Sequence, residues 1–263
     1  MCLVFISYKI HPSHRFVIAG NRDEFFRRPT AQLNFIDSDK KILGGQDLQQ
    51  GGMWLGVTRT DRNGRDSRNF RFGVITNYRA GATNNVGQPS RGDIVLEYLQ
   101  SGASAIDAVE DLATRSARYA GFNVFFGDET QLVFFSNAEN RVHVLEPGFY
   151  GLSNHLLDSP WPKVLRGKEL LYTSMCGPEK INVGKIIQLL QDRQVPADAA
   201  LPDTGVGLDW ERFLAPVFID GTDYGTRSSA VVQIGYDGQI CFAEKTYLRQ
   251  GEHKLPLYKQ MHL

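Results

Sequence analysis

The sequence lacks the composition biases of nucleic-acid-binding, membrane-spanning and disulfide-rich proteins. Its 263 residues include 29 Lys plus Arg and 29 Asp plus Glu, so no net charge attracts the chain to nucleic acid or to an anionic membrane. No apolar run approaches the roughly 20 residues that cross a bilayer, so no transmembrane segment is expected. Three scattered cysteines are too few for a disulfide framework or a zinc site. We therefore expect neither a nucleic-acid partner nor a bound metal.

The first residues also lack the marks of a secretory signal. Residues 1–8 contain no basic n-region and no small-residue cleavage site. Together with the scarcity of cysteine, this predicts a protein of the reducing cytoplasm. A composition of 42% hydrophobic and 22% charged residues is typical of a globular protein, and we interpret residues 1–263 as one domain.

Hydrophobic periodicity predicts strands and helices in alternating groups. Strand-like runs occupy residues 3–9, 16–19, 54–59, 70–78, 122–126, 131–135, 141–145, 228–236 and 239–247. Helices are expected to follow Ser90 and Ser104 and to occupy residues 162–175 and 183–192. Residues 60–69 read as an exposed hairpin tip and 195–209 as a loop. Hairpin connections in this order predict an α+β fold with antiparallel sheets and helices packed outside.

Cys2 is a candidate nucleophile because of its position in the chain. Removal of Met1 would leave Cys2 with both a thiol and a free α-amine. An α-amine has an ordinary pKa of about 7.7–8.0, so near neutral pH it can act as a base. One residue would then supply nucleophile and base together. The alternative is that Cys2 is a small apolar residue that fills space at the start of a strand.

Four polar residues, Asn21 to Glu24, directly follow the second predicted strand. Composition favours a solvated turn for such a run. Alternatively, the first two strands are hairpin neighbours, and Arg22 then lies beside the strand that carries Cys2. A guanidinium in that place would favour the thiolate and orient a carbonyl or carboxylate of the substrate.

Other polar residues lie at the ends of apolar strands. Asn77 and Asn154 each close such a run, where an Asn amide can donate into an oxyanion hole or form a turn. Arg227 precedes the strand at 228–236. The glycine-rich stretch before Trp54 lacks the Lys-Ser/Thr and the helix of a phosphate loop. We interpret it as tight turns that bring Trp54 to a cleft, although Trp54 can also belong to the core.

In their order along the chain these motifs resemble the NRDE family, also called the transport and Golgi organisation family, within the Ntn-hydrolase superfamily. The motifs run nearly end to end: Met1-Cys2, Asn21-Arg22-Asp23-Glu24-Phe25, Arg28-Pro29, Gly44-Gly45-Gln46-Asp47, Gly51-Gly52-Met53-Trp54-Leu55-Gly56, Thr76-Asn77-Tyr78, Ser90-Arg91-Gly92, Gly121-Phe122-Asn123, Tyr150-Gly151-Leu152-Ser153-Asn154, Pro160-Trp161 and Tyr224-Gly225-Thr226-Arg227-Ser228. The resemblance implies the four-layer αββα sandwich of N-terminal-nucleophile (Ntn) hydrolases, with two antiparallel sheets flanked by helices.

A more distant resemblance, to cysteine Ntn amidases of the bile-salt hydrolase and penicillin V acylase type, implies roles for single residues. Their pattern has an N-terminal Cys, an early Arg-Asn-x-Asp turn, two strand-end Asn residues and a late Arg. It implies a catalytic set of Cys2, Arg22, Asp23, Asn77, Asn154 and Arg227. This chain has Asn-Arg-Asp-Glu at the early turn, so Asp23 or Glu24 could hold the α-amine. We expect the substrate to contact Asn21, Glu24, Trp54 and Tyr78.

Two functions follow from the resemblance. The first is a cysteine amidohydrolase that acts on a non-peptide C–N bond of a small acyl amide or lipid-like substrate. The alternative is a non-catalytic haem or lipid/acyl-CoA binding and trafficking protein that uses the same cleft, since family members have been linked to these processes. No cofactor is required, although haem is a possible cargo. The six histidines form no shared pattern and there is no Cys-x-x-Cys-His motif. A third possibility is a scaffold whose catalytic residues are vestigial.

Overall fold

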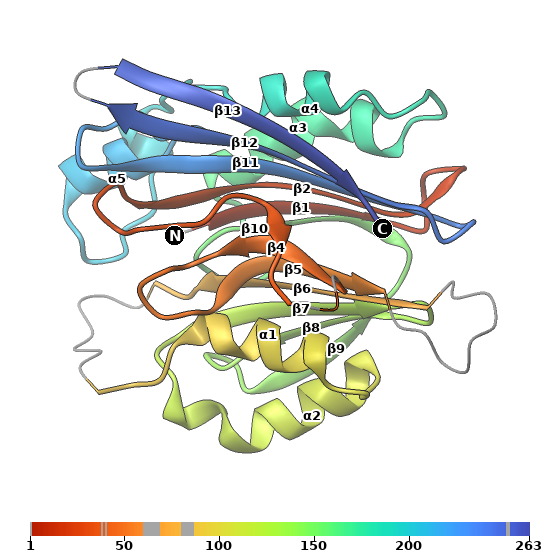
Figure 1. The fold of residues 1–263 in the computed structure, drawn as a ribbon. Helices are drawn as coiled ribbons and strands as arrows, with labels where there is room; N and C mark the ends of the chain where they lie inside the picture. The colour runs from red at the N-terminus through yellow and green to blue at the C-terminus, as the bar shows by residue number, and fades with distance from the viewer. Residues whose placement is uncertain (1, 38, 40, 60–68, 80–86, 251–252) are drawn as a thin grey trace.

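Two antiparallel β-sheets pack face to face in the computed structural model of the chain, and α-helices cover their outer faces (Figure 1). The α+β class predicted from the sequence is therefore confirmed, with more residues in strands than in helices. The structure describes all residues except 1, 38, 40, 60–68, 80–86 and 251–252.

Six strands form the first sheet, and every neighbouring pair in it is antiparallel. In spatial order they are β10 (Gly148–Leu152), β1 (Cys2–Tyr8), β2 (His14–Phe25), β11 (Tyr224–Gly235), β12 (Ile240–Gln250) and β13 (His253–His262). The central pair, β2 and β11, joins residues about 200 positions apart in the chain.

Seven strands form the second sheet in simple chain order. They are β3 (Asn34–Phe35), β4 (Ile42–Gln46), β5 (Met53–Arg59), β6 (Phe70–Asn77), β7 (Phe122–Asp128), β8 (Leu132–Ser136) and β9 (Arg141–Leu145). The predicted hairpin tip between β5 and β6 falls almost wholly on residues 60–68, which lie outside the described residues.

Helices on the outer faces complete the fold. They are α1 (Arg91–Gln100), α2 (Ala105–Arg115), α3 (Pro162–Cys176), α4 (Val183–Leu189) and α5 (Leu208–Leu214), with short 3-10 turns at Ser116–Arg118 and Asp198–Ala200. Figure 1 shows α1 and α2 against the seven-stranded sheet and α3 and α4 against the six-stranded sheet. None of the described helices combines the length and the apolar character that crossing a membrane requires.

Side chains of β1 alternate between two buried layers, as the period of a strand requires. Cys2, Val4 and Ile6 belong to the core between the two sheets. Leu3 and Phe5 point the other way and pack with residues of α3 and α4. Because β1 is buried on both faces, its sequence reads as an almost unbroken apolar run.

The largest difference from the sequence-based prediction concerns Asn21 to Glu24. They do not form a solvated turn, because β2 continues through them to Phe25. Asn21, Arg22 and Asp23 are buried. The alternative interpretation, in which Arg22 lies beside the strand of Cys2, is the correct one, since Cys2 and Arg22 are direct partners in the β1–β2 ladder.

Several elements were absent from the prediction. Strands β3, β4 and β13 were missed, and β4 occupies part of the glycine-rich stretch interpreted as turns. Strand β10 was expected only as an apolar strand closed by Asn154, without bounds. Helix α5 begins inside the segment predicted as a loop, and α4 ends three residues earlier than expected. Of these strands only β10 has a partner distant in sequence, since it pairs with β1. Strands β3, β4 and β13 pair with strands next to them in the chain, so local pattern and not range is what failed there.

Candidate active site

A cavity of about 130 Å³ opens beside Cys2, where β1 begins and β2 ends. It lies between the two sheets, because its walls include residues of β2, β5 and β6. Six of the ten residues proposed from the sequence line it: Cys2, Arg22, Asp23, Glu24, Trp54 and Asn77. Within the described part of the chain, there is no group of three or more His, Cys, Asp or Glu side chains that could hold a metal ion.

The thiol of Cys2 is buried and not part of a disulfide. Burial raises the pKa of this thiol, and the neighbouring Arg22 guanidinium opposes the rise without cancelling it. At neutral pH the sulfur therefore carries its proton. Attack on a carbonyl then requires a base that removes this proton, so the expected thiolate stabilisation by Arg22 is not sufficient.

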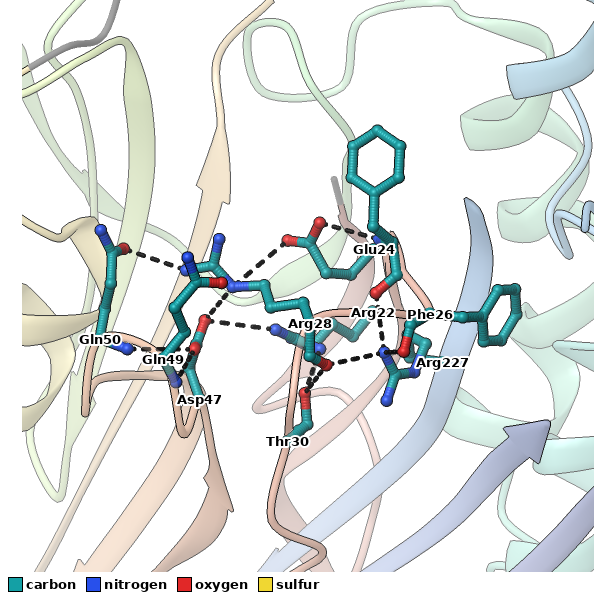
Figure 2. Close-up of polar contacts among 10 residues, drawn as sticks. Arg22, Glu24, Phe26, Arg28, Thr30, Asp47, Gln49, Gln50 and Arg227 are labelled. Carbon is teal, nitrogen blue, oxygen red and sulfur yellow. Dashed lines mark hydrogen bonds and ion pairs between the residues drawn. The ribbon is translucent and has the colours of Figure 1, made fainter. Parts of the chain in front are cut away.

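Asp47 joins two arginines on one wall of the cavity (Figure 2). Its Oδ2 lies 3.5 Å from Arg22 Nη2 and 2.5 Å from Arg28 Nε. Arg28 Nε is also 4.0 Å from Glu24 Oε2, and Arg22 Nη1 donates a hydrogen bond of 3.1 Å to Thr30 Oγ1. Each of these two guanidinium groups is therefore held in place by a carboxylate, which limits its rotamers.

Asp23 is almost completely buried and is tied to β11. Thr226 Oγ1 donates a 2.8 Å hydrogen bond to Asp23 Oδ1. Burial raises the pKa of the Asp23 carboxyl, and the Lys163 ammonium opposes the rise. Asp23 therefore lies where it can hold a cationic group at the end of β1.

Lys163 was not identified from the sequence, because a lysine in an amphipathic helix is normally exposed. It lies in the first turn of α3 and is 3% exposed, and its Nζ has no hydrogen-bond partner among the described residues. Burial lowers the pKa of Lys163 to about 8, although the Asp23 carboxylate favours the charged form. A buried amine without hydrogen bonds is costly, and the Asp23 carboxylate is the group that most favours its charged form.

Replacing Lys163 with methionine is expected to change how stability depends on pH. The native pKa is about 8 and the ordinary value 10.5, so between them the unfolded chain holds a proton that the native protein has released. The free energy of unfolding of the unmodified protein should therefore rise through this window, by up to about 3 kcal/mol relative to the variant.

Urea unfolding at several pH values between about 7.5 and about 10.5 measures this difference. Lys185→Met replaces an exposed lysine on α4 and should give a curve parallel to that of the unmodified protein. A parallel curve for Lys163→Met as well would show that the native pKa of Lys163 is not lowered.

The two strand-end asparagines have different places. Asn77 lines the cavity. Asn154 is fully buried, and its Nδ2 donates a 2.9 Å hydrogen bond to the backbone carbonyl of Asn77. Asn154 therefore braces the end of β6, and of the two side chains that of Asn77 is the one placed to donate to a bound oxyanion.

Arg227 acts on the cavity through the backbone. It lies at a β-bulge between Thr226 and Ser228, where β11 pairs with β2. Its Nη1 donates to the carbonyls of Phe25, Phe26 and Arg28, at 2.8, 3.0 and 3.0 Å (Figure 2). Arg227 does not line the cavity, but it holds the segment that carries Arg28.

Asn21 and Tyr78 also lie outside the lining of the cavity. The Asn21 amide donates to the carbonyls of Leu190 and Val217. The ring of Tyr78 stacks on His155, with 5.3 Å between centroids. The structure gives both residues contacts within the fold, and the expectation that they contact the substrate stays a prediction.

Comparison with known proteins gives one consistent result. The sequence model of the family described as "Transport and Golgi organisation 2" matches residues 1–249. Similar curated proteins include the "Transport and Golgi organization protein 2 homolog" of Bos taurus, 28% identical over 94% of both chains. The protein of the same name from Homo sapiens is 27% identical over 94% of both chains. The "Transport and Golgi organization protein 2" of Drosophila melanogaster is 27% identical over 94% of this chain and 92% of its own.

Proposed function

This chain belongs to the Transport and Golgi organisation 2 family, and from that premise and the cavity at Cys2 we propose that it is a cysteine amidohydrolase of the Ntn type. Its substrate is a small acyl amide or a lipid-like amide with a non-peptide C–N bond. The arrangement of helices outside two packed antiparallel sheets is compatible with the αββα sandwich of Ntn hydrolases (Figure 1). The proposed compartment is the cytoplasm, whose reducing conditions keep a lone thiol active.

One observation carries the proposal: the thiol at the start of β1 faces a cavity beside the polar groups that its chemistry requires. Arg22 lies opposite Cys2 in the ladder, and Asp23 and Asn77 line the same cavity. An inert cysteine used only to fill space has no need of such neighbours.

In the proposed mechanism Met1 is removed, and the α-amine of Cys2 acts as the base that the protonated thiol requires. Sγ attacks the carbonyl carbon of the amide while its proton passes to the α-nitrogen. The C–N bond then breaks, the leaving amine takes that proton, and a thioester remains on Cys2. Water, deprotonated by the same α-amine, hydrolyses the thioester and restores the thiol.

The neighbouring residues support these steps. The Asp23 carboxylate orients the α-amine, and the Lys163 ammonium favours the charged form of that carboxyl group. Asn77 donates a hydrogen bond to the oxyanion, a contribution typically worth about 2.7–4 kcal/mol of the barrier. Arg22, fixed by Asp47 and Thr30, orients the substrate next to the sulfur.

The test combines the intact mass of the purified protein with labelling by iodoacetamide. We expect loss of Met1 and a rate of alkylation at Cys2 that rises with the deprotonation of a group of pKa near that of an α-amine. Mass spectrometry of peptides separates this reaction from labelling of Cys176 and Cys241. Retained Met1, or a Cys2 that is trimmed but unreactive, would contradict the proposal.

The alternative is a non-catalytic haem or lipid/acyl-CoA carrier that uses the same cavity. No histidine whose side chain is described lines the cavity, and His155 Nδ1 is bonded to Ser159 Oγ at 2.8 Å. These contacts give haem no histidine ligand there, so among the described lining residues Cys2 or Met53 would have to hold the iron. A haem titration followed in the Soret region tests the carrier: tight binding that Cys2→Ala leaves unchanged would favour it over the hydrolase.

A further inference from the structure

A third guanidinium reaches the cavity from the side of the seven-stranded sheet. Arg91 is the first residue of α1 and lines the cavity together with its neighbours Ser90 and Gly92. The backbone of Gly92 lies directly on that of Gly52, where a Cβ would come within 2.4 Å of the Gly92 carbonyl carbon. This close approach fixes the start of α1 against the cavity, and with it the place of Arg91.

Arg91 differs from the other cations of the cavity because it has no ion-pair partner among the described residues. Arg22 and Arg28 are paired with Asp47, and Arg28 also lies near Glu24. Asp23 faces the Lys163 ammonium. Arg91 Nη1 donates a 3.0 Å hydrogen bond to the carbonyl of Gly121, but no described carboxylate lies within the 4.0 Å of an ion pair.

Arg91 is also only partly accessible to water. Burial lowers the pKa of its guanidinium, and this lowering is opposed by the sulfur of Cys2 when it is deprotonated and, more weakly, by Glu24. A partly desolvated cation is costly unless an anion pairs with it. Arg91 is therefore a cation without an ion-pair partner among the described residues, in the same cavity as the Cys2 sulfur that would attack the substrate.

We propose that the substrate of the Cys2 cavity carries an anionic group, a carboxylate or a phosphate, that pairs with Arg91 while its scissile carbonyl faces Sγ. The planar guanidinium suits either group, because it can donate two parallel hydrogen bonds. Because Arg91 and Cys2 line the same cavity, of about 130 Å³, the anionic group and the scissile carbonyl lie at the same end of the substrate. This inference rests on the proposed function, because it names the substrate class of that same site.

Two alkylating reagents of nearly equal size test the proposal without a known substrate. Iodoacetate carries a carboxylate where iodoacetamide carries a neutral amide. We expect Arg91→Gln to lower the rate of Cys2 alkylation by iodoacetate about tenfold more than the rate by iodoacetamide, the effect of one charge-assisted pair. Gln keeps a donor for the Gly121 carbonyl. Arg91→Lys should retain part of the preference, and Arg118→Gln, which removes an exposed arginine, should change neither rate.

Other results would contradict either the anion site at Arg91 or the proposed function. An equal change with both reagents would show that Arg91 acts on the thiol and not on an anion, and it would overturn the proposal, as would no change. A Cys2 that reacts with neither reagent would instead contradict the proposed function. In that case thermal unfolding with inorganic phosphate or acetate decides. A stabilisation lost in Arg91→Gln supports the anion site, and none in the unmodified protein rejects it.

Discussion

Replacing Cys2 with alanine is expected to lower the rate of acyl transfer by at least about 10³-fold, because the variant has lost the nucleophile. Alanine is smaller and apolar, and position 2 is the first residue of β1, so the strand pairs with β2 and β10 as before. The rate can be measured with p-nitrophenyl acetate, which should give a burst of product from the unmodified protein and no burst from the variant.

Two further variants serve as a control for the thiol and as a test of the α-amine. Cys176→Ala removes a partly buried thiol outside the cavity and should leave the burst intact. A glutamate inserted between Met1 and Cys2 should prevent removal of Met1, so the thiol remains while its free α-amine is lost. We expect that protein to be nearly as slow as Cys2→Ala. If Cys2→Ala keeps its burst, the acyl transfer takes place at another residue and the proposal is wrong.

Asn21→Ala is expected to cost about 3–5 kcal/mol of the free energy of unfolding. The Asn21 side chain is fully buried and donates to the carbonyls of Leu190 and Val217, at 2.9 and 2.8 Å. Its Oδ1 accepts a 2.7 Å hydrogen bond from Ser229. Alanine leaves these buried polar groups without their partner, at about 1–3 kcal/mol each. Urea unfolding measures the loss.

The control is Asn34→Ala, which alters an exposed asparagine of β3 and should stay within about 0.5 kcal/mol of the unmodified protein. The Asn21 amide faces the C-terminal end of α4 and the segment at Val217. Iodoacetamide should therefore alkylate Cys2 of the folded Asn21→Ala variant at the normal rate. A stable variant with weakened substrate binding would contradict this view and restore Asn21 to the substrate contacts expected from the sequence.

The sequence predicts the fold best where pattern and contact are local. The hairpin of β1 and β2 follows from two apolar runs separated by a short turn, and it brings Arg22 opposite Cys2. The polar end of β2 could not be predicted as strand from composition, because its partners lie far along the chain. Asn21 is satisfied by residues near 190 and 217, and Asp23 by Thr226.

The candidate site shows a similar limit. Motif order selects residues that gather at one end of the molecule, and six of the ten share a cavity. Motif order does not show which face of a strand a side chain takes, so Asn154 and Arg227 could not be separated from Asn77 and Arg22 before the register was known. Lys163 was hidden because burial of a lysine depends on packing between α3 and the sheet.

The pairing of β2 with β11 also limits when the site can form during synthesis. Arg22 and Asp23 leave the ribosome about 200 residues before Ser228 and Thr226, their partners in the ladder. Until β11 is made, Asn21 and Asp23 lack hydrogen bonds that they have in the folded protein, and a contact of such long range is slow to form. The thiol at the beginning of the chain therefore gains its charged surroundings only after the last strands have been synthesised. Cys2 stays without its complete site throughout most of translation.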